Sequence, residues 1–171
     1  MQTNSPDGLQ HIFRQAMRRF TSSVSVVTAS DGKSAGGLTA TAISSLSMDP
    51  PTLLICVNKS AETHPLIDGT GRYCVNLLAQ GQSFLAQKFA GAGGEKGLAK
   101  YVGVDFETLP SGSRALKGCL ASFDCKVVAT VDEASHSLFI GRVSQVLIGQ
   151  AHKPLLYGDR AYVTELGEAL Q

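Results

Sequence analysis

Gly36–His64 reads GGLTATAISSLSMDPPTLLICVNKSAETH, and the rest of the chain is arranged around this stretch. It opens with two glycines and small alternating residues, and small side chains let a flat ligand approach the backbone closely. It closes with Asn58–Ser60, which offers amide, ammonium and hydroxyl donors to an anionic group such as phosphate. We predict two strands joined by a tight turn at Asp49-Pro50-Pro51. An ordinary hairpin with a polar rim is the alternative.

The chain has 171 residues, 43% of them apolar, and a formal net charge of +1. This length suits one domain, expected over residues 9–171 behind a flexible tail at 1–8. The small net charge gives no electrostatic reason to expect a nucleic-acid or membrane partner. The sequence contains no run of about 18 apolar residues, so no membrane-spanning helix is predicted. The polar N-terminal segment also lacks the apolar region of a secretory signal.

The cysteines form no C-x-x-C pair and no zinc-finger spacing: they are Cys56, Cys74, Cys119 and Cys125. We expect most of them to be buried small hydrophobic residues of a cytoplasmic protein, because cytosolic thiols stay reduced. A catalytic or disulfide role is the less favoured alternative, since no histidine partner is evident in the sequence.

Helical periodicity predicts two main helices, over Leu9–Phe20 and Gln82–Ala90. A shorter helix is expected from Thr63 to Asp68, with Ser60 as its cap and Pro65 in its first turn. The glycine-dense run after the second main helix is predicted to be a mobile loop, and residues 165–171 a frayed helix.

Short β-rich segments between turn signals predict the strands: Val24–Ala29, Gly36–Ser47, Leu53–Val57, Arg72–Leu78, Ala115–Val131, His136–Ile148, Pro154–Tyr157 and Ala161–Val163. Asp31-Gly32 is the strongest hairpin signal, and Asp132–Ser135 turns the long hairpin near the end of the chain. Tyr101–Pro110 is expected to be loop with a little helix. Many short strands with few helices favour a closed or nearly closed antiparallel barrel over a parallel βαβ sheet.

Several catalytic motifs are missing from the sequence. There is no G-x-G-x-x-G, no Walker A, no H-E-x-x-H and no G-x-S-x-G. The histidines are scattered, and no carboxylates pair at a recurring helical spacing, so no metal site is expected. Any chemistry is therefore expected to come from a bound organic cofactor that the protein positions.

Six blocks follow one another in order: GLTATA with SLSMDPP (37–42, 45–51), CVNKS with TH (56–60, 63–64), YCVNLL (73–78), FAG (89–91), HSLFIG (136–141) and PLLY (154–157). This ordered set resembles the short-chain flavin reductase family, the reductase components of two-component monooxygenases. The resemblance covers nearly the whole chain, from about Phe13 to Tyr162. It is more specific to the family than to any substrate.

The resemblance implies a mainly β fold: an FMN-binding split barrel with six antiparallel, Greek-key-like strands and a few helices. It also implies a homodimer with flavin near the subunit contact. The implied activity is NAD(P)H-dependent reduction of FMN or FAD, which supplies reduced flavin to a partner monooxygenase in the cytoplasm. Such hydride transfer needs no protein acid or nucleophile, only stacked rings with reacting atoms about 3–3.5 Å apart.

Two other functions stay open. One is a non-catalytic FMN-binding flavoprotein that acts as a sensor or store. The other, ranked last, is a split-barrel oxidase acting on a pyridoxal-type phosphate, which would need a second cluster of basic residues. The sequence does not distinguish FMN from FAD or NADH from NADPH.

By resemblance, Thr39–Ala42 would run along the isoalloxazine ring, with alternate side chains facing it. Ser45 and Asn58–Ser60 would hold the phosphate and ribityl chain, and His136 would be the catalytic residue beside the stacked rings. The implied cofactor-binding residues are Thr39, Ala40, Thr41, Ala42, Ser45, Val57, Asn58, Lys59, Ser60, Thr63, His64, Phe89, His136 and Tyr157.

Several of these residues have an ordinary structural alternative. Phe89 and Tyr157 are equally well explained by core packing, and His64 by a solvent-facing position at a helix start. Relatives often have Asn in place of Thr41 and Arg in place of Lys59. They often have Gly-Asp where this chain has Ala134-Ser135, which leaves a carboxylate partner for the next residue, His136, open.

Overall fold

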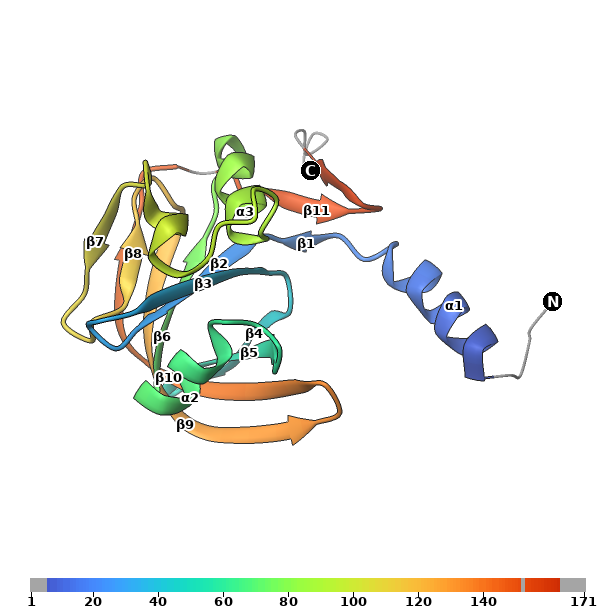
Figure 1. Cartoon of the computed structure of the whole chain (residues 1–171), viewed down its shortest axis with the longest axis horizontal. Helices are drawn as coiled ribbons and strands as arrows, with labels where there is room; N and C mark the ends of the chain where they lie inside the picture. Colours follow the sequence, from blue (N-terminus) through green and yellow to red (C-terminus); the bar gives the residue numbers. More distant parts are fainter. Residues whose placement is uncertain (1–5, 152, 164–171) are drawn as a thin grey trace.

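The computed structural model describes residues 6–151 and 153–163, and strands dominate it (Figure 1). The main sheet is antiparallel, with strand order β3-β2-β6-β9-β10-β5-β4. Its strands are β2 (Ser25–Ser30), β3 (Ala35–Ala40), β4 (Ile43–Met48), β5 (Pro51–Asn58), β6 (Arg72–Leu77), β9 (Ala121–Glu133) and β10 (His136–Ile148). The fold is mainly β, as predicted, with seven strands in the main sheet where six were expected.

Smaller elements complete the described structure. One small sheet contains β1 (Ser22–Ser23), β11 (Leu156–Gly158) and β12 (Ala161–Val163), and another contains β7 (Phe106–Thr108) and β8 (Arg114–Leu116). The helices are α1 (Pro6–Met17), α2 (His64–Thr70) and α3 (Ser83–Phe89), with 3₁₀ turns η1 (Gln80–Gln82) and η2 (Gly97–Tyr101).

β3 and β4 lie at opposite edges of the main sheet, yet only Thr41 and Ala42 separate them in the chain. Three peptide units span at most about 11 Å, so the sheet must curl until its edges come that close. The N–H of Ile43 donates to the Thr41 carbonyl (3.0 Å), and the N–H of Cys56 donates to the Ala42 carbonyl (3.0 Å). The sheet therefore forms a barrel that is open along one line, and this two-residue link crosses the opening.

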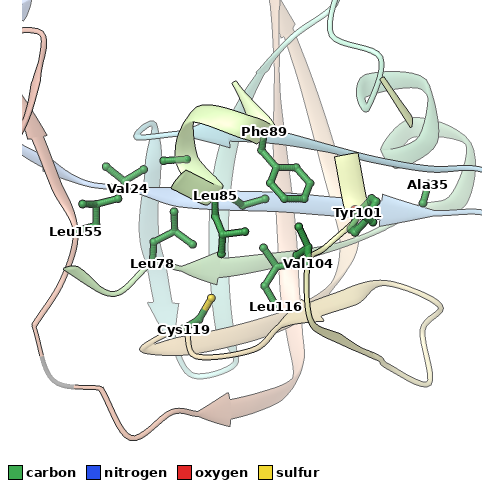
Figure 2. Packing of buried hydrophobic residues seen from close by; sticks show 12 residues of the cluster. Val24, Ala35, Leu78, Leu85, Phe89, Tyr101, Val104, Leu116, Cys119 and Leu155 are labelled. Atoms are coloured by element: carbon green, nitrogen blue, oxygen red, sulfur yellow. The ribbon is translucent and has the colours of Figure 1, made fainter. Parts of the chain in front are cut away.

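Two clusters of buried side chains cover the two faces of β2, because neighbouring residues of a strand point to opposite sides. Val26 belongs to the cluster that packs α3 and η2 onto the sheet, and Figure 2 shows that cluster around Phe89 and Tyr101. Val27 belongs to the other cluster, with Ile55, Val57, Ile67, Tyr73 and Phe139. β3 lies beside β2 and is thus supported from behind by α3.

The sequence predicts one strand over Gly36–Ser47, but the structure has two, β3 and β4, which pair with different neighbours. The predicted strand Ala115–Val131 is likewise divided into β8 and β9, because Gly118 adopts a positive φ of 75° between them. The segment from Tyr101 to Pro110 contains β7 rather than loop alone. These errors concern pairing between distant segments, which local patterning does not reveal.

The predicted helix boundaries also need correction. α1 begins at Pro6 and ends at Met17, so residues 6–8 belong to a helix rather than to a flexible tail. Proline suits this position because the first turn of a helix does not need its N–H. α2 begins at His64 after Thr63, so Ser60 is not its cap.

Other predictions are confirmed, including α3, β6, β10, β12 and the β2–β3 hairpin at Asp31-Gly32. The helix predicted over residues 165–171 lies outside the described residues. The predicted mobile loop is attached at two points: Lys88 lies 3.9 Å from Glu95, and Glu62 accepts the N–H of Gly97 at 3.2 Å.

All four cysteines are free thiols, three of them buried and Cys56 half-buried. Burial raises the pKa of the Cys119 and Cys125 thiols to about 12. These thiols stay protonated at neutral pH, so they are poor nucleophiles. Within the described residues, no helix has the length and apolar character needed to cross a bilayer.

Candidate functional site

A cavity of about 250 Å³ lies where β3 passes into the two-residue link across the barrel opening. Segments far apart in the chain line it: Val24, Thr39, Ala40, Thr41, Ala90, Tyr157 and Tyr162. The rings of the two tyrosines pack edge to face with centroids 5.4 Å apart. Four of the predicted cofactor-binding residues therefore share one cavity.

β3 is an edge strand, and only β2 pairs with it among the described strands. An edge strand presents the N–H and C=O groups of alternate residues outward, without a strand partner. The cavity therefore combines small apolar side chains with backbone donors and acceptors. That combination suits a flat heteroaromatic ring, whose heteroatoms need hydrogen bonds and whose faces need apolar contact.

The support for β3 explains why this part of the sequence is so rich in glycine. A Cβ on Gly37 would stand 2.5 Å from Cδ1 of Phe89, so only glycine lets the strand rest on that ring. The hydroxyl of Thr39 donates to the Ala86 carbonyl of α3 (2.6 Å) and therefore faces the helix. Phe89 is 1% exposed and belongs to the core, so it supports the cavity from behind without lining it.

A partly buried ion pair supports β3 at Gly37. Nζ of Lys100 lies 2.8 Å from Oε1 of Glu62 and also donates to the carbonyl of Gly37 (2.9 Å). Lys100 is only 7% exposed, and a buried ammonium group needs such partners. The hydroxyl of Tyr101 donates to the Gly36 carbonyl at 2.7 Å. Side chains distant in sequence thus fix the backbone that forms the cavity wall.

The Asn58–Ser60 turn is the second group of predicted site residues. Oδ1 of Asn58 accepts the N–H and the hydroxyl of Ser60, at 2.9 and 2.8 Å. Nζ of Lys59 donates to the Ala134 carbonyl (3.2 Å) and lies 3.6 Å from Asp132. The side chain of Lys59 is 39% exposed, so an incoming phosphate can compete for it.

His136 is the first residue of β10 and pairs in register with Asn58 of β5. Its ring is half-buried, and Nδ1 lies 2.9 Å from the hydroxyl of Ser135. Nε2 has no partner among the described residues, which leaves it available to a ligand. The partner of this ring is therefore a serine hydroxyl and not a carboxylate.

His64 also lies at this hairpin, where Nε2 is 2.8 Å from the hydroxyl of Ser137. Its ring centroid is 5.2 Å from that of Phe139, so it packs on β10 rather than facing solvent freely. The neighbouring Thr63 is fully buried, and its hydroxyl makes no hydrogen bond within the described part of the chain. Thr63 packs against β3 at Gly36, because a Cβ on Gly36 would stand 2.9 Å from the Thr63 hydroxyl oxygen.

β5 connects the two groups of residues. On one side of β5, the N–H of Cys56 donates to the Ala42 carbonyl. On the other side, Asn58 pairs in register with His136. Along β5 the two contacts are two residues apart, and across the sheet Ala42 and His136 each lie one strand spacing from β5. Together these separations place Ala42 about 12 Å from His136. A ligand with a long flat ring system can therefore extend from the cavity toward the histidine.

Two further predicted residues lie outside both groups. The side chain of Val57 is fully buried in the core, so only its backbone can face a ligand. Ser45 is exposed on the outer strand β4, opposite Leu53. Sequence reasoning missed Val24, Ala90 and Tyr162 of the cavity lining, and no local pattern in the sequence marked them.

The donors and acceptors of the two groups of residues suit an organic cofactor. No group of three or more His, Cys, Asp or Glu side chains that could hold a metal ion occurs among the described residues. A flavin fits better: its ring matches the cavity beside β3, and its phosphate matches the donors of the Asn58–Ser60 turn.

The chain is similar to known proteins both in sequence and in fold. Residues 17–165 match the family model described as "Flavin reductase like domain". The chain is 34% identical over 151 residues to an FMN reductase (NADH) RutF of Stutzerimonas stutzeri, covering 88% of this chain and 85% of that protein. It is 34% identical over 154 residues to the reductase component of 4-hydroxyphenylacetate 3-monooxygenase of Thermus thermophilus, covering 90% and 95%. The solved structure of flavin reductase PheA2 superposes with a TM-score of 0.82 at 34% identity, covering 92% of this chain and 98% of that one.

Proposed function

The chain belongs to the flavin reductase like family, and from this membership we propose that it reduces FMN or FAD with NADH and supplies the reduced flavin to a partner monooxygenase. The observation that carries the proposal is the cavity at the barrel opening, lined by Thr39, Ala40, Thr41 and Tyr157. The name of the Stutzerimonas relative supports NADH as donor, and that of the Thermus relative supports a monooxygenase partner.

Each part of the site has a separate task in this proposal. A bound flavin supplies the hydride acceptor. The edge of β3 and Tyr157 hold its ring, orient it and keep water from one face. The Asn58–Ser60 turn binds the phosphate, for which Lys59 exchanges its contact with Asp132. These residues supply position and electrostatics, which is what hydride transfer between stacked rings requires.

We further propose that His136 contacts the nicotinamide nucleotide, because its ring is only half-buried. With Nδ1 engaged by Ser135, Nε2 is free to hydrogen-bond the nicotinamide carboxamide or the reduced flavin. The histidine orients the donor and removes no proton from it. We therefore assign His136 as the catalytic residue that touches the substrate.

The proposal includes a homodimer that forms around α1. α1 stands away from the barrel in Figure 1, and its apolar side chains are exposed: Leu9, Ile12, Phe13 and Met17, followed by Phe20. A helix of this length is marginal without a packing partner. A groove of about 430 Å³ between α1 and β11 is lined by Phe13, Met17 and Phe20, and it shares Thr41 and Tyr157 with the first cavity. A second copy seated there would complete the wall of the flavin site.

Sedimentation of the wild type and of Phe13→Asp tests this dimer. We expect the wild type to sediment as a dimer and the variant as a monomer with weaker flavin binding. A monomeric wild type at micromolar concentration would contradict the dimer.

Steady-state oxidation of the nicotinamide, with NADH and NADPH each crossed against FMN and FAD, tests the activity. We expect flavin-dependent oxidation of NADH that continues for many turnovers with free flavin. If the protein binds flavin tightly but shows no turnover with either nucleotide, it is a flavin store or sensor and the proposed activity is wrong.

A further inference from the structure

A chain of four polar side chains joins three segments next to His136. Nε2 of His64 lies 2.8 Å from Oγ of Ser137, which donates to Oδ1 of Asp132 at 2.5 Å. Oδ2 of Asp132 lies 3.6 Å from Nζ of Lys59. The chain thus runs from the start of α2, through both strands of the β9–β10 hairpin, to the turn that follows β5.

The proton positions in this chain follow from counting donors. The hydrogen bond from Ser137 and the nearby Lys59 lower the pKa of Asp132, so its carboxylate is ionised and only accepts. Ser137 has one hydroxyl proton, and it is used in that bond. Its oxygen must therefore accept from His64, which places a proton on Nε2 of that ring. Ser137 is fully buried, so loss of either partner would remove one of the two hydrogen bonds of a buried hydroxyl.

The location of this chain suggests what it does. Ser137 directly follows His136, and it pairs in register with Asp132 across the hairpin. The tip beyond them is exposed, and Ala134 there adopts a positive φ of 45°. The N–H of Lys59 donates to the Ser135 carbonyl at 2.9 Å. The chain of side chains, with the buried Ser137 at its centre, therefore attaches the base of this tip, from which His136 projects, to α2 and to the turn after β5.

We propose that Ser137, Asp132 and His64 are positioning residues that hold His136 in the orientation needed to receive the nicotinamide nucleotide. This inference rests on the proposed function, because it assigns these residues to the same site. They act through His136 and do not contact the nucleotides themselves.

A double-mutant cycle tests this proposal. Ser137→Ala and Asp132→Asn are each made in the wild type and in a His136→Ala background. We expect Ser137→Ala to lower kcat/KM for NADH about ten-fold in the wild type, as expected for a misplaced contact. In the His136→Ala background, the same change should alter kcat/KM by less than about two-fold, because the residue that it positions is gone. Flavin affinity should change by less than about three-fold in every variant.

Matched variants separate positioning from general damage. Ser144→Ala removes a hydroxyl from the same strand, one that donates to the Asp124 carbonyl (3.1 Å) far from the tip, and should leave kcat/KM unchanged. His64→Gln retains an N–H donor and should preserve more activity than His64→Ala. If Ser137→Ala does not fold, Asp132→Asn takes its place in the double-mutant cycle, because the Asp132 side chain is 63% exposed and its replacement disturbs the core less.

The imidazole NMR signals of His136 give a readout that does not need turnover. We expect one sharp set in the wild type and in Ser144→Ala, and shifted or broadened signals in Ser137→Ala and Asp132→Asn. An equal loss of kcat/KM in both backgrounds, or unchanged His136 signals, would overturn the positioning role. Absence of turnover in the wild type would instead contradict the proposed function, and the NMR comparison would still decide this inference.

Discussion

The cavity beside β3 and the tip of the β9–β10 hairpin both belong to the candidate site, but different chemical groups form them. One wall of the cavity is the edge strand β3, held in place by Phe89 and Lys100 behind it. The tip is held by polar side chains that bond to one another, among them Asp132 of the hairpin, which lies 3.6 Å from Lys59 of the turn after β5. The backbone of β3 can be altered only by changing the residues that support it. The side chains at the tip can be replaced one at a time.

This difference assigns different tasks to the two regions. A backbone wall offers fixed donors and acceptors at no cost in side-chain entropy, which suits a ring that must be held in one orientation. The side chains that bond to one another at the hairpin suit the task of holding His136 in place for a second nucleotide. We therefore expect changes behind the cavity to affect folding and flavin binding together, and changes at the tip to affect turnover.

The largest effect should come from Gly37→Ala. The new methyl group would clash with the Phe89 ring at 2.5 Å, and overpacking of this kind costs about 1–3 kcal/mol. We expect a lower midpoint of urea unfolding and weaker FMN binding, measured by fluorescence titration. Gly81→Ala is the control, because no atom lies within 4 Å of its added Cβ. Wild-type FMN affinity in Gly37→Ala would show that β3 does not form the wall.

Glu62→Gln should have the next largest effect, because it leaves the ammonium group of Lys100 without its anionic partner. Loss of one partner of a buried pair costs about 3–5 kcal/mol, and the partial exposure of Glu62 (32%) reduces this to about 2 kcal/mol. We expect lower stability at pH 7 in urea unfolding. Glu107→Gln, at an exposed position, is the control.

The same ion pair predicts a pH dependence. Burial raises the pKa of Glu62, but the bonds from Lys100 and from the Gly97 N–H outweigh it and lower the pKa below 4.5. A lowered folded-state pKa contributes stability that is present above about pH 4.5 and lost as the pH falls through the folded value. Urea unfolding between pH 3 and 7 should show this loss in the wild type and a flatter profile in Glu62→Gln. Parallel profiles would contradict it.

His136→Ala should affect catalysis without affecting the fold. Because the histidine orients the nucleotide but transfers no proton, we expect kcat with NADH to fall about ten-fold, less than for loss of a general base. FMN affinity should change by less than about three-fold. A loss of flavin affinity that matched the loss of turnover would show that His136 binds the flavin itself.

Lys59→Ala should give the smallest effect, because the side chain is partly exposed and water screens its charge. We expect FMN binding to weaken about three-fold, while riboflavin, which has no phosphate, binds as before. Equal weakening for both ligands would show that Lys59 does not contact the phosphate.

The sequence predicted most elements with strong local patterning and failed where distant segments decide the outcome. β10 and α3 follow from alternation and helical spacing. Nothing local marks Thr41 and Ala42 as the link between opposite edges of the sheet, because the Thr/Ala pattern runs through them unchanged. The three-residue strands β7 and β8 are too short to produce a pattern.

The candidate site shows the same limit. Sequence order placed Thr39, Ala40 and Thr41 together, but only the fold brings Tyr157 and Tyr162 to them. Alternation along β3 did not reveal that the hydroxyl of Thr39 bonds to α3, and it did not place Phe89 behind the wall. The network of Asp132, Ser137 and His64 depends on strand register, which the sequence does not give. The binding roles of these residues stay predictions.

Amide hydrogen exchange, measured by mass spectrometry with and without saturating FMN, is the most direct test of flavin binding in the cavity beside β3. If the ring bonds to the outward edge of β3, exchange in peptides that cover residues 39–42 should slow on FMN binding, with a smaller change at 58–60. FMN that binds and slows exchange elsewhere, while residues 39–42 exchange as before, would contradict a flavin seat at the barrel opening.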